Sequence, residues 1–264
     1  DIRVVEGKIA RIIPNASDVD NDSLTFTFSQ PFNNNGEWQT SLGDSGEYNI
    51  NVTLRDGHGG IDSKTAKVIV IPKIFINEFE LDDGEEWAEL YNPGENDVDI
   101  SGWQLWDGMS SPHFKYEFDN VLGSKEHYVI ITSGLNNDGE FLTLYDSENL
   151  SVDTTPLLTD SQNNDKTWQR RPDSSLNWVF DISTRGLDNN ADVIAPIVRL
   201  ISPQDNAYFE TDKILFNYTA ADNKAANLVC GFYSDVNGTY EKLAEGLIVN
   251  GSIGNFHASD MADG

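Results

Sequence analysis

The stretch Tyr48-Asn49-Ile50-Asn51-Val52-Thr53-Leu54 sets the fold class, because its even positions are apolar and its odd positions are polar. This period of two predicts a β-strand with one buried face, since alternate side chains of an extended chain point to opposite sides. Similar alternation recurs at 24–28, 68–71, 128–131, 141–145, 197–201 and 214–218. Clusters of Asn, Asp and Gly separate these runs, as turns separate short strands. We therefore predict an all-β chain built of antiparallel β-sandwiches.

The chain of 264 residues is strongly acidic, with 17 Lys and Arg against 44 Asp and Glu and a net charge of −27. Nucleic-acid backbones are bound through Lys and Arg, so this balance argues against a direct nucleic-acid partner. No run approaches the roughly 20 apolar residues of a spanning helix, so we predict no membrane span. The content of 11% aromatic residues favours folded domains over a disordered acidic chain.

Two proline positions divide the sequence into three predicted domains. Pro72 follows the last strand of a first unit, and Ala195-Pro196 follows the polar stretch 187–192. We predict domains at 1–72, 73–190 and 191–264. The middle domain has 7 basic and 24 acidic residues, a net charge of −17. The first domain is −4 (6 basic, 10 acidic) and the third is −6 (4 basic, 10 acidic), so the acidity is concentrated in the middle.

Two Asp-bearing loops lie at strand ends of the first domain. Asp18, Asp20 and Asp22 alternate in one loop, and Asp56 stands in the Gly-rich loop 55–60. Alternating carboxylates present several oxygens to one point, which suits a hard cation such as Ca²⁺. The spacing lacks the Gly and Glu positions of an EF-hand loop. The alternative interpretation is an Asx-rich turn that caps a strand.

Five motifs of the first domain resemble the cadherin-like, immunoglobulin-fold domains of prokaryotic surface proteins. In order they are Val5-Glu6-Gly7, Asp18-x-Asp20-x-Asp22-x-Leu24, Gly36-Glu37-Trp38, Asp44-x-Gly46-x-Tyr48 and Arg55-Asp56-Gly57. The resemblance covers residues 2–71 and implies a calcium site at Asp18, Asp20 and Asp22, with Asp56 and Glu6 as weaker candidates. Tyr48 suits a tyrosine corner, in which the hydroxyl group bonds the backbone upstream.

The middle domain places carboxylates beside Trp residues, in Glu86-Trp87-Ala88-Glu89-Leu90-Tyr91-Asn92-Pro93-Gly94 and again at 98–107. Paired carboxylates beside aromatic rings are one pattern of glycosidases. We favour the alternative, in which the rings form sandwich core and Glu89 makes a structural hydrogen bond or pairs with Arg170. No motif fixes two carboxylates at a set separation or predicts a raised pKa for Glu86 or Glu89. We therefore predict no catalytic residue.

These segments together resemble the lamin tail domain, an immunoglobulin-like β-sandwich. The resemblance rests on E-W-x-E-L-Y-N-P-G at 86–94, D-x-S-G-W-x-L-x-D at 99–107 and the closing W-x-R-x-P-D…W…T-x-G-x-x-N at 168–189. It covers about 74–190 and implies a non-catalytic interaction or spacer module of secreted or surface proteins. Nucleic acid and membranes are proposed partners of the family, but the charge of −17 argues against direct DNA binding.

One acidic cluster of the middle domain contains Asp82, Asp83, Glu85 and Glu86. A bridging cation is one interpretation of these four carboxylates. A solvated acidic loop is the interpretation that we favour.

The third domain resembles immunoglobulin-like repeats of archaeal secreted proteins, in 195–203, 214–223 and 226–233. That family continues into a strand that bears a Trp and a second Cys. The resemblance therefore implies that Cys230, the single cysteine, is half of a disulfide whose partner lies outside this sequence. Such disulfides belong to oxidising, extracytoplasmic compartments. Taken alone, Cys230 indicates a free thiol, and no His and Asn constellation predicts a nucleophile.

Six N-x-S/T sequons are glycosylation candidates, at Asn15, Asn51, Asn149, Asn217, Asn237 and Asn250. As a set they favour a secreted glycoprotein. A seventh sequon, at Asn21, lies inside the Asp loop, where a glycan would crowd the calcium site.

These patterns predict a non-catalytic spacer or adhesion region of an archaeal surface or secreted protein, located outside the cell and stiffened by Ca²⁺. Its expected partners are neighbouring domains of a longer chain and a cell-surface protein or glycan. The alternative is an accessory glycan- or protein-binding module of a secreted hydrolase. Burial of Trp87, Trp103, Trp106, Trp168 and Trp178 would exclude an aromatic binding platform.

Overall fold

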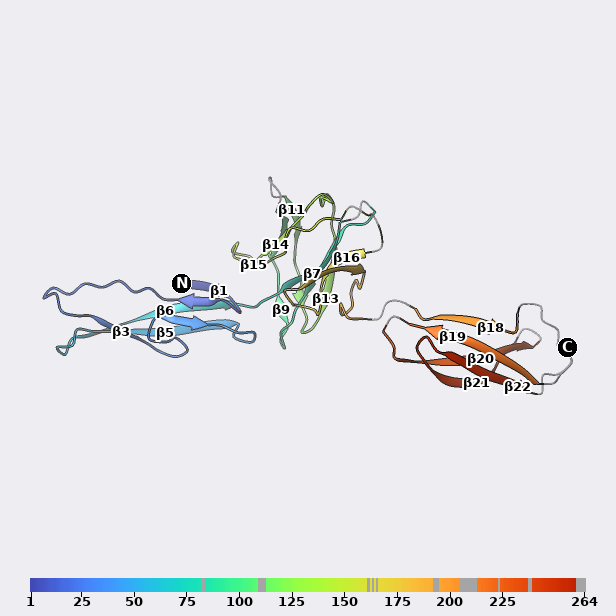
Figure 1. Cartoon of the computed structure of the whole chain (residues 1–264). Coiled ribbons are helices and arrows are strands. Elements are labelled where there is room, and N and C mark those ends of the chain that lie inside the picture. Colours follow the sequence, from blue (N-terminus) through green and yellow to red (C-terminus); the bar gives the residue numbers. More distant parts are fainter. Residues whose placement is uncertain are drawn as a thin grey trace. The chain divides into compact units, whose positions relative to one another are not determined.

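The computed structural model describes residues 1–81, 84–108, 113–160, 162, 164, 166–191, 195–204, 213–222, 224–236 and 239–259. These residues form strands, turns and loops, and no helix occurs among them (Figure 1). The prediction of an all-β chain is therefore confirmed. The chain divides into two compact units, 1–191 and 192–264. In the described part, no helix is long and apolar enough to cross a membrane.

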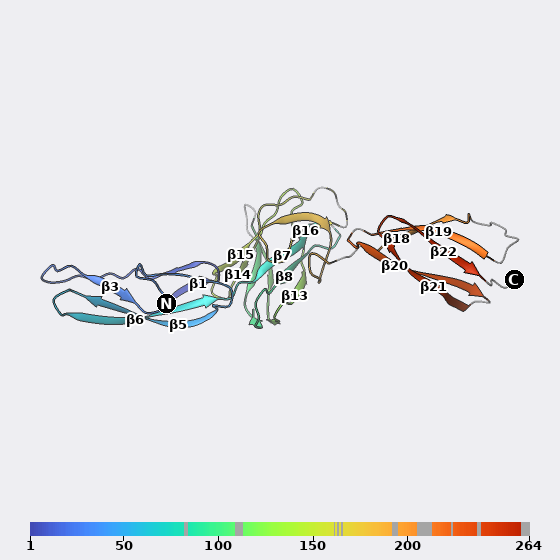
Figure 2. The same cartoon turned by 60° about the horizontal axis from the view of Figure 1, so that its bottom comes forward.

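The first compact unit begins with a sandwich over residues 1–71, which we call the first sandwich (Figure 2). Its strands are β1(Ile2–Val5), β2(Ile9–Arg11), β3(Thr25–Phe28), β4(Glu37–Gln39), β5(Gly46–Arg55) and β6(Ile61–Ile71). One sheet has the order β1-β6-β5-β3, and β2 pairs with β4 in the other. Strand β1 runs parallel to β6, from Ile2 opposite Val68 to Val5 opposite Ile71.

Alternation along β5 fills the core of the first sandwich. Ile50 is 1% exposed, whereas Asn49 and Asn51 on the opposite face are exposed. The buried members of this core are Val4, Ala10, Ile12, Phe32, Trp38, Ile50, Val68 and Val70. The Tyr48 hydroxyl donates to the carbonyl oxygen of Asp44 at 2.8 Å, which is the upstream bond expected of a tyrosine corner.

A larger sandwich follows within the same compact unit. Its strands are β7(Phe75–Glu80), β8(Trp87–Tyr91), β9(Val98–Asp99), β10(Gln104–Asp107), β11(Phe114–Glu117), β12(Val121–Leu122), β13(His127–Ile131), β14(Leu142–Tyr145), β15(Ser151–Thr154), β16(Lys166–Arg170) and β17(Trp178–Ile182). They form a five-stranded sheet β13-β8-β7-β16-β17, a four-stranded sheet β11-β10-β14-β15 and the small pair β12-β9.

The inner faces of these sheets enclose the principal core of the first unit. Phe79, Leu90, Leu105, Leu142 and Leu144 have no exposed surface. Val5 and Ile71, at the ends of β1 and β6, belong to the same buried cluster. The apolar core is therefore continuous from the end of the first sandwich into the next one.

The described residues of the second compact unit form the strands β18(Ile197–Ser202), β19(Lys213–Ala221), β20(Asn227–Val236), β21(Thr239–Val249) and β22(Ile253–Ser259). The sheet β18-β19-β22 and the pair β20-β21 are its two layers. Its core is small: Tyr218, Ala220 and Ile248 are buried, with Leu228, Cys230 and Phe232 packed against them.

Candidate functional site

The two Asp-bearing loops of the first sandwich are joined by one side-chain contact. Oδ2 of Asp22 lies 3.1 Å from Nδ1 of His58. Oδ1 of Asp18 accepts the backbone N–H groups of Asp20 and Asp22 at 2.8 and 3.1 Å. In the second loop, Oδ1 of Asp56 accepts the N–H of His58 at 2.7 Å, and this bond lowers the pKa of Asp56. Asx-type turns therefore organise both loops.

The four Asp residues of the predicted calcium site do not gather into a ready-made cation site. Among the described residues, no group of three or more His, Cys, Asp or Glu is placed to hold a metal ion. The weaker candidate Glu6 has other partners, because Oε1 accepts Gly43 N–H at 2.9 Å and Oε2 accepts Lys73 N–H at 2.9 Å. Calcium binding by Asp18, Asp20, Asp22 and Asp56 stays a prediction.

The acidic cluster near β8 is divided among different partners. Residues 82 and 83 lie outside the described residues. Glu85 is exposed and pairs with Arg185 at 2.5 Å. Oε2 of Glu86 accepts the N–H of Leu135 at 2.7 Å. The two described carboxylates therefore serve separate structural contacts.

Two glutamates lie at the centre of the five-stranded sheet. Glu78 on β7 and Glu89 on β8 are register partners, and neither has exposed surface. Oε2 of Glu89 accepts Gly186 N–H at 2.6 Å, and Oε1 of Glu78 accepts the Thr167 hydroxyl at 2.5 Å. Burial raises the pKa of Glu89 to about 7 and also raises the pKa of Glu78, because the charged form loses its hydration. The sequence holds no motif that predicts this shift, because residue spacing carries no information on desolvation.

The closing T-x-G-x-x-N motif covers this pair of glutamates. The Thr184 hydroxyl donates to Oε2 of Glu78 at 2.7 Å, and Gly186 supplies the backbone N–H to Glu89. The Asn189 side chain donates to the carbonyl oxygens of Asn77 and Arg170, at 3.2 and 2.7 Å. The motif therefore supplies donors that buried carboxylate and carbonyl oxygens need.

Of the two roles predicted for Glu89, the structure has the structural hydrogen bond, from Gly186 and Asn77, and not the pair with Arg170. Arg170 instead pairs with Asp153 at 3.0 Å. Its Nε also donates to the carbonyl oxygen of Ile76 at 2.8 Å, and its guanidinium lies 4.7 Å from the Trp178 ring centre. The difference arises because β15 supplies a second carboxylate, which the linear sequence does not place near β16. Buried Arg pairs most strongly with a carboxylate that meets its planar donors.

Lys73 joins the first sandwich to the following one. Its backbone N–H donates to Glu6, as described above, and its Nζ lies 2.7 Å from Oδ1 of Asp153. The other oxygen of Asp153 accepts from Arg170 and from the N–H of Ile76, at 3.0 and 2.9 Å. One carboxylate therefore accepts from two cationic side chains and from one backbone N–H of β7. Burial lowers the pKa of Lys73, an effect that Asp153 opposes.

A second ionic contact lies across the same junction. Nη1 of Arg3 on β1 lies 2.6 Å from Oε1 of Glu148, and Nη2 contacts Oδ2 of Asp146. Asp146 is 2% exposed, so this contact is largely shielded from solvent. Together with Val5 and Ile71 in the shared core, these contacts bind the two sandwiches into one compact unit. No sequence pattern predicts this junction, because its partners are far apart in the chain.

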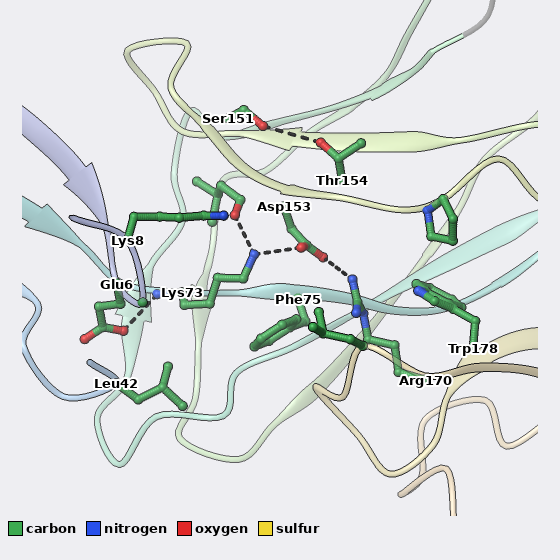
Figure 3. A pocket seen from close by; sticks show the side chains of 14 residues that line it. Glu6, Lys8, Leu42, Lys73, Phe75, Ser151, Asp153, Thr154, Arg170 and Trp178 are labelled. Atoms are coloured by element: carbon green, nitrogen blue, oxygen red, sulfur yellow. Dashed lines mark hydrogen bonds and ion pairs between the residues drawn. The ribbon is translucent and has the colours of Figure 1, made fainter. Parts of the chain in front are cut away.

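A cleft of about 570 Å³ lies beside the junction (Figure 3). Figure 3 places Asp153 between Lys73 and Arg170, with the rings of Phe75 and Trp178 near the guanidinium. The first sandwich contributes Glu6, Lys8 and Leu42 to the cleft wall, among other residues. Asp153 pairs with both cations, one through each oxygen, so the three side chains form a structural ion triad.

Residues 69–175 match the Lamin Tail Domain family model. We call residues 73–191 the lamin-tail region, because β17 and the motif at 184–189 complete the sheet that the matched residues begin. The predicted resemblance is confirmed for the matched stretch. The cadherin-like and archaeal-type resemblances of its neighbours stay predictions. No curated protein matches the chain.

Three solved structures share only a distant likeness with the chain. Bacteroides ovatus mixed-linkage glucan utilization locus SGBP-B, in complex with a mixed-linkage heptasaccharide, is 12% identical, with 94% of this chain and 65% of that chain covered and a TM-score of 0.24. Amycolatopsis orientalis exo-chitosanase CsxA is 12% identical (68% and 23% covered, TM-score 0.21). Salmonella alpha-2-macroglobulin is 9% identical (97% and 21% covered, TM-score 0.21). The chain thus spans 65% of the first protein and under a quarter of the other two, and TM-scores this low carry no argument about function.

The Trp residues of the lamin-tail region divide into two groups. Trp87 and Trp103 are 4% and 5% exposed, as expected of sandwich core. Trp106, Trp168 and Trp178 are half-buried. Because three of the five Trp side chains are partly exposed, burial does not exclude an aromatic binding surface on the lamin-tail region.

The glycosylation candidates differ in how their side chains are engaged. Asn15, Asn51 and Asn149 are exposed. The Asn217 Nδ2, the atom that carries a glycan, donates to Ser202 Oγ at 2.7 Å. The Asn250 Nδ2 donates to two backbone carbonyl oxygens, of Asp222 and Ala225. Asn237 lies outside the described residues.

Cys230 lies on β20 with a half-buried, free thiol, beside Tyr218 in the small core of the second unit. Burial raises the pKa of Tyr218, and the neighbouring thiol adds to that shift. A disulfide to a cysteine outside this sequence stays a prediction.

Proposed function

We propose that this region is a non-catalytic spacer of an archaeal surface or secreted protein, in which two sandwiches are locked together as one rigid segment. The observation that carries the proposal is the junction of the first sandwich with the lamin-tail region. Arg3 pairs with Asp146 and Glu148, and the backbone N–H of Lys73 donates to Glu6. Val5 and Ile71 extend one core across the boundary. Inter-domain contacts that are buried and apolar restrict domain motion.

The burial of Glu89 supports the non-catalytic part of this proposal. A general acid must come within hydrogen-bond reach of a substrate. Glu89 and Glu78 have no exposed surface, and structural donors occupy their oxygens. The raised pKa of Glu89 is therefore the consequence of burial in a sheet and not of tuning for catalysis.

An extracellular location accords with the net charge of −27, with the exposed sequons at Asn15, Asn51 and Asn149, and with the disulfide predicted for Cys230. In this proposal Ca²⁺ at Asp18, Asp20 and Asp22 stiffens the far loops of the first sandwich. The partners are the neighbouring domains of a longer chain and a cell-surface protein or glycan.

Rigidity of the junction can be measured by ¹⁵N NMR relaxation on the chain. The proposal expects one rotational correlation time for residues 1–71 and 75–191. The double variant Arg3→Ala/Glu6→Ala removes the contacts of the first sandwich with Asp146, Glu148 and the Lys73 N–H, and it should separate the two values. Arg11→Ala, which breaks an exposed pair with Glu37, should not. Two correlation times in the unaltered chain would reject the rigid spacer. Detection of the native protein only in the cytosolic fraction of its source cells would reject the location.

A further inference from the structure

We propose that the outer face of the sheet β11-β10-β14-β15 is a binding site for a neutral saccharide. This site lies in the lamin-tail region, and it does not depend on the spacer role. Figure 1 labels β11, β14 and β15 of this sheet. Strand β10 lies between β11 and β14.

Strand register decides which side chains share the outer face. Leu105 and Leu144 are register partners without exposed surface, so these two side chains point into the core. The residues of the opposite phase therefore face outward. Across the four strands they form two rows, Phe114-Trp106-Thr143-Thr154 and Glu117-Gln104-Tyr145-Ser151.

Aromatic rings form one part of this face. Phe114 is 49% exposed and meets Trp106 edge to face, with ring centres 5.7 Å apart. Tyr145 and Phe141 are half-buried and line a pocket of about 340 Å³ together with Trp106. Such rings offer flat apolar surfaces beside a polar rim.

Local contacts hold two of these rings in place before any ligand arrives. The Trp106 Nε1 donates to Oε1 of Gln104 at 3.0 Å, and Nε2 of Gln104 donates to Glu117 at 2.9 Å. A Cβ at Gly108 would lie 1.8 Å from the ring of Phe141, so glycine is required for this ring to lie against the backbone. A site that is ordered in advance loses less entropy on binding.

The hydroxyl and amide groups of the described pocket lining belong to Thr143, Tyr145 and Asn149, and no unpaired charge occurs in that lining. Glu117, on the same outer face, lies outside the lining and accepts from Gln104. Asp107 is the one charged residue of the lining, and its Oδ2 lies 2.9 Å from Nζ of Lys115. Both side chains are at most 7% exposed, so the pair is neutralised within the protein. The ligand that matches this lining is therefore uncharged.

A pyranose ring meets these requirements. One face of the sugar presents C–H groups that pack on an aromatic ring, and its edge presents hydroxyl groups to hydrogen-bonding side chains. Pockets of this kind combine apolar walls with a few polar groups that set orientation. A wholly apolar ligand would leave the exposed Asn149 amide without hydrogen bonds from water or ligand, which is unfavourable. The Thr143 hydroxyl already lies 3.2 Å from the Thr154 hydroxyl.

The Asn149 sequon lies at the same pocket, so an attached glycan is a second source of sugar there. The binding experiment therefore uses the full chain from a bacterial host that does not glycosylate it. The probes are the hexasaccharides of glucose, mannose and N-acetylglucosamine, added separately. Binding is measured by isothermal titration calorimetry.

The expected result is that at least one hexasaccharide binds with a Kd of about 1 mM or tighter. Trp106→Ala and Tyr145→Ala should each weaken binding about tenfold, since each removes one stacking surface. Tyr233→Ala, which removes a 58% exposed ring of the second unit, should leave Kd unchanged.

Failure of all three hexasaccharides to bind would overturn the proposal, as would unchanged binding by both Trp106→Ala and Tyr145→Ala. If either variant does not fold, ¹H–¹⁵N spectra of the unaltered chain decide the matter. Ligand-induced shifts should cluster on the Trp106 indole N–H and on amides of β10 and β14. Shifts confined to other strands would contradict this site. A negative result would leave the spacer proposal intact.

Discussion

The lamin-tail region and the second compact unit are both two-layered β structures, but they bury different kinds of residues. The lamin-tail region encloses large side chains such as Phe79 and Phe118, together with the buried ionisable side chains of Glu78, Glu89 and Arg170. Among the described residues of 192–264, only Tyr218, Ala220 and Ile248 are buried hydrophobics, and no polar side chain is buried. Strand pairing therefore defines the architecture of a sandwich, whereas the side chains buried between the sheets determine its stability.

Alternation explains part of this difference. In the second unit, Val229 and Leu247 are register partners on the outer face, at 65% and 73% exposed. Their neighbours Leu228 and Ile248 face the small core. Apolar residues thus lie on both faces of β20-β21, and this sheet gains less from burying one face than the sheets of the lamin-tail region do.

The largest effect is expected for Arg170, a buried charge of the lamin-tail region. Arg170→Met should lower the free energy of unfolding by about 3–5 kcal/mol, because it breaks a buried pair with Asp153. Arg11→Met, at an exposed pair with Glu37, should cost about 1 kcal/mol or less. Urea unfolding followed by Trp fluorescence measures both, since all six Trp lie within residues 1–191. Equal losses would remove buried charge as a distinction between the regions.

Matched leucines compare the two cores directly. Leu105→Ala should cost about 2–5 kcal/mol, since the side chain is fully buried. Leu247→Ala should change the stability of the second unit by about 0.5 kcal/mol or less, since that leucine is mostly exposed. The reaction of the Cys230 thiol with an aromatic disulfide reagent, measured against urea, reports on the second unit. A large loss for Leu247→Ala would mean that its exposed face is covered in solution.

The pH dependence of the first unit should reflect Glu89. Its pKa is about 7 in the folded state against an ordinary value of 4.5, so the folded state holds a proton that the unfolded state has released. The stabilisation is complete below about pH 4.5 and is lost as the pH rises to about 7. At about 1.4 kcal/mol per pH unit this amounts to roughly 3 kcal/mol. Glu89→Gln should therefore flatten the fall in stability between pH 5 and 8, measured by urea unfolding.

The same variant also bears on catalysis. Glu89→Gln should leave any hydrolytic activity of the chain unchanged, because the carboxylate is buried. An unaltered pH profile would contradict the assignment of the titration to Glu89. A loss of hydrolysis would restore the glycosidase alternative.

The smallest effect concerns the first sandwich. Ca²⁺ should raise its melting temperature by a few degrees relative to chelator, as expected for a ligand that binds only the folded state. Asp20→Ala should abolish the shift, whereas Asp138→Ala in an exposed loop of the lamin-tail region should not. Absence of a shift, or a shift that survives Asp20→Ala, would reject calcium binding by the Asp18–Asp22 loop.

Sequence patterns were most informative where the physics is local. The alternation at 48–54 and at 141–145 predicted strands that the structure contains as β5 and β14. The Tyr48 corner was predictable because its acceptor, Asp44, lies four residues upstream. The proposed saccharide-binding face was harder to predict from the sequence. Trp106 and Thr143 lie on different strands, and only the register of β10 with β14 brings them together.

The sequence by itself determined the all-β class, the strand rhythm and the lamin-tail motifs, because a period of two and a turn composition act over a few residues. Only the tertiary structure decided the partner of Arg170, the raised pKa of Glu89 and the junction at Lys73. Each of these depends on which distant strand comes near and on how much water is excluded there. Desolvation and pairing belong to the packed interior, so they follow from the fold and not from the spacing of residues along the chain.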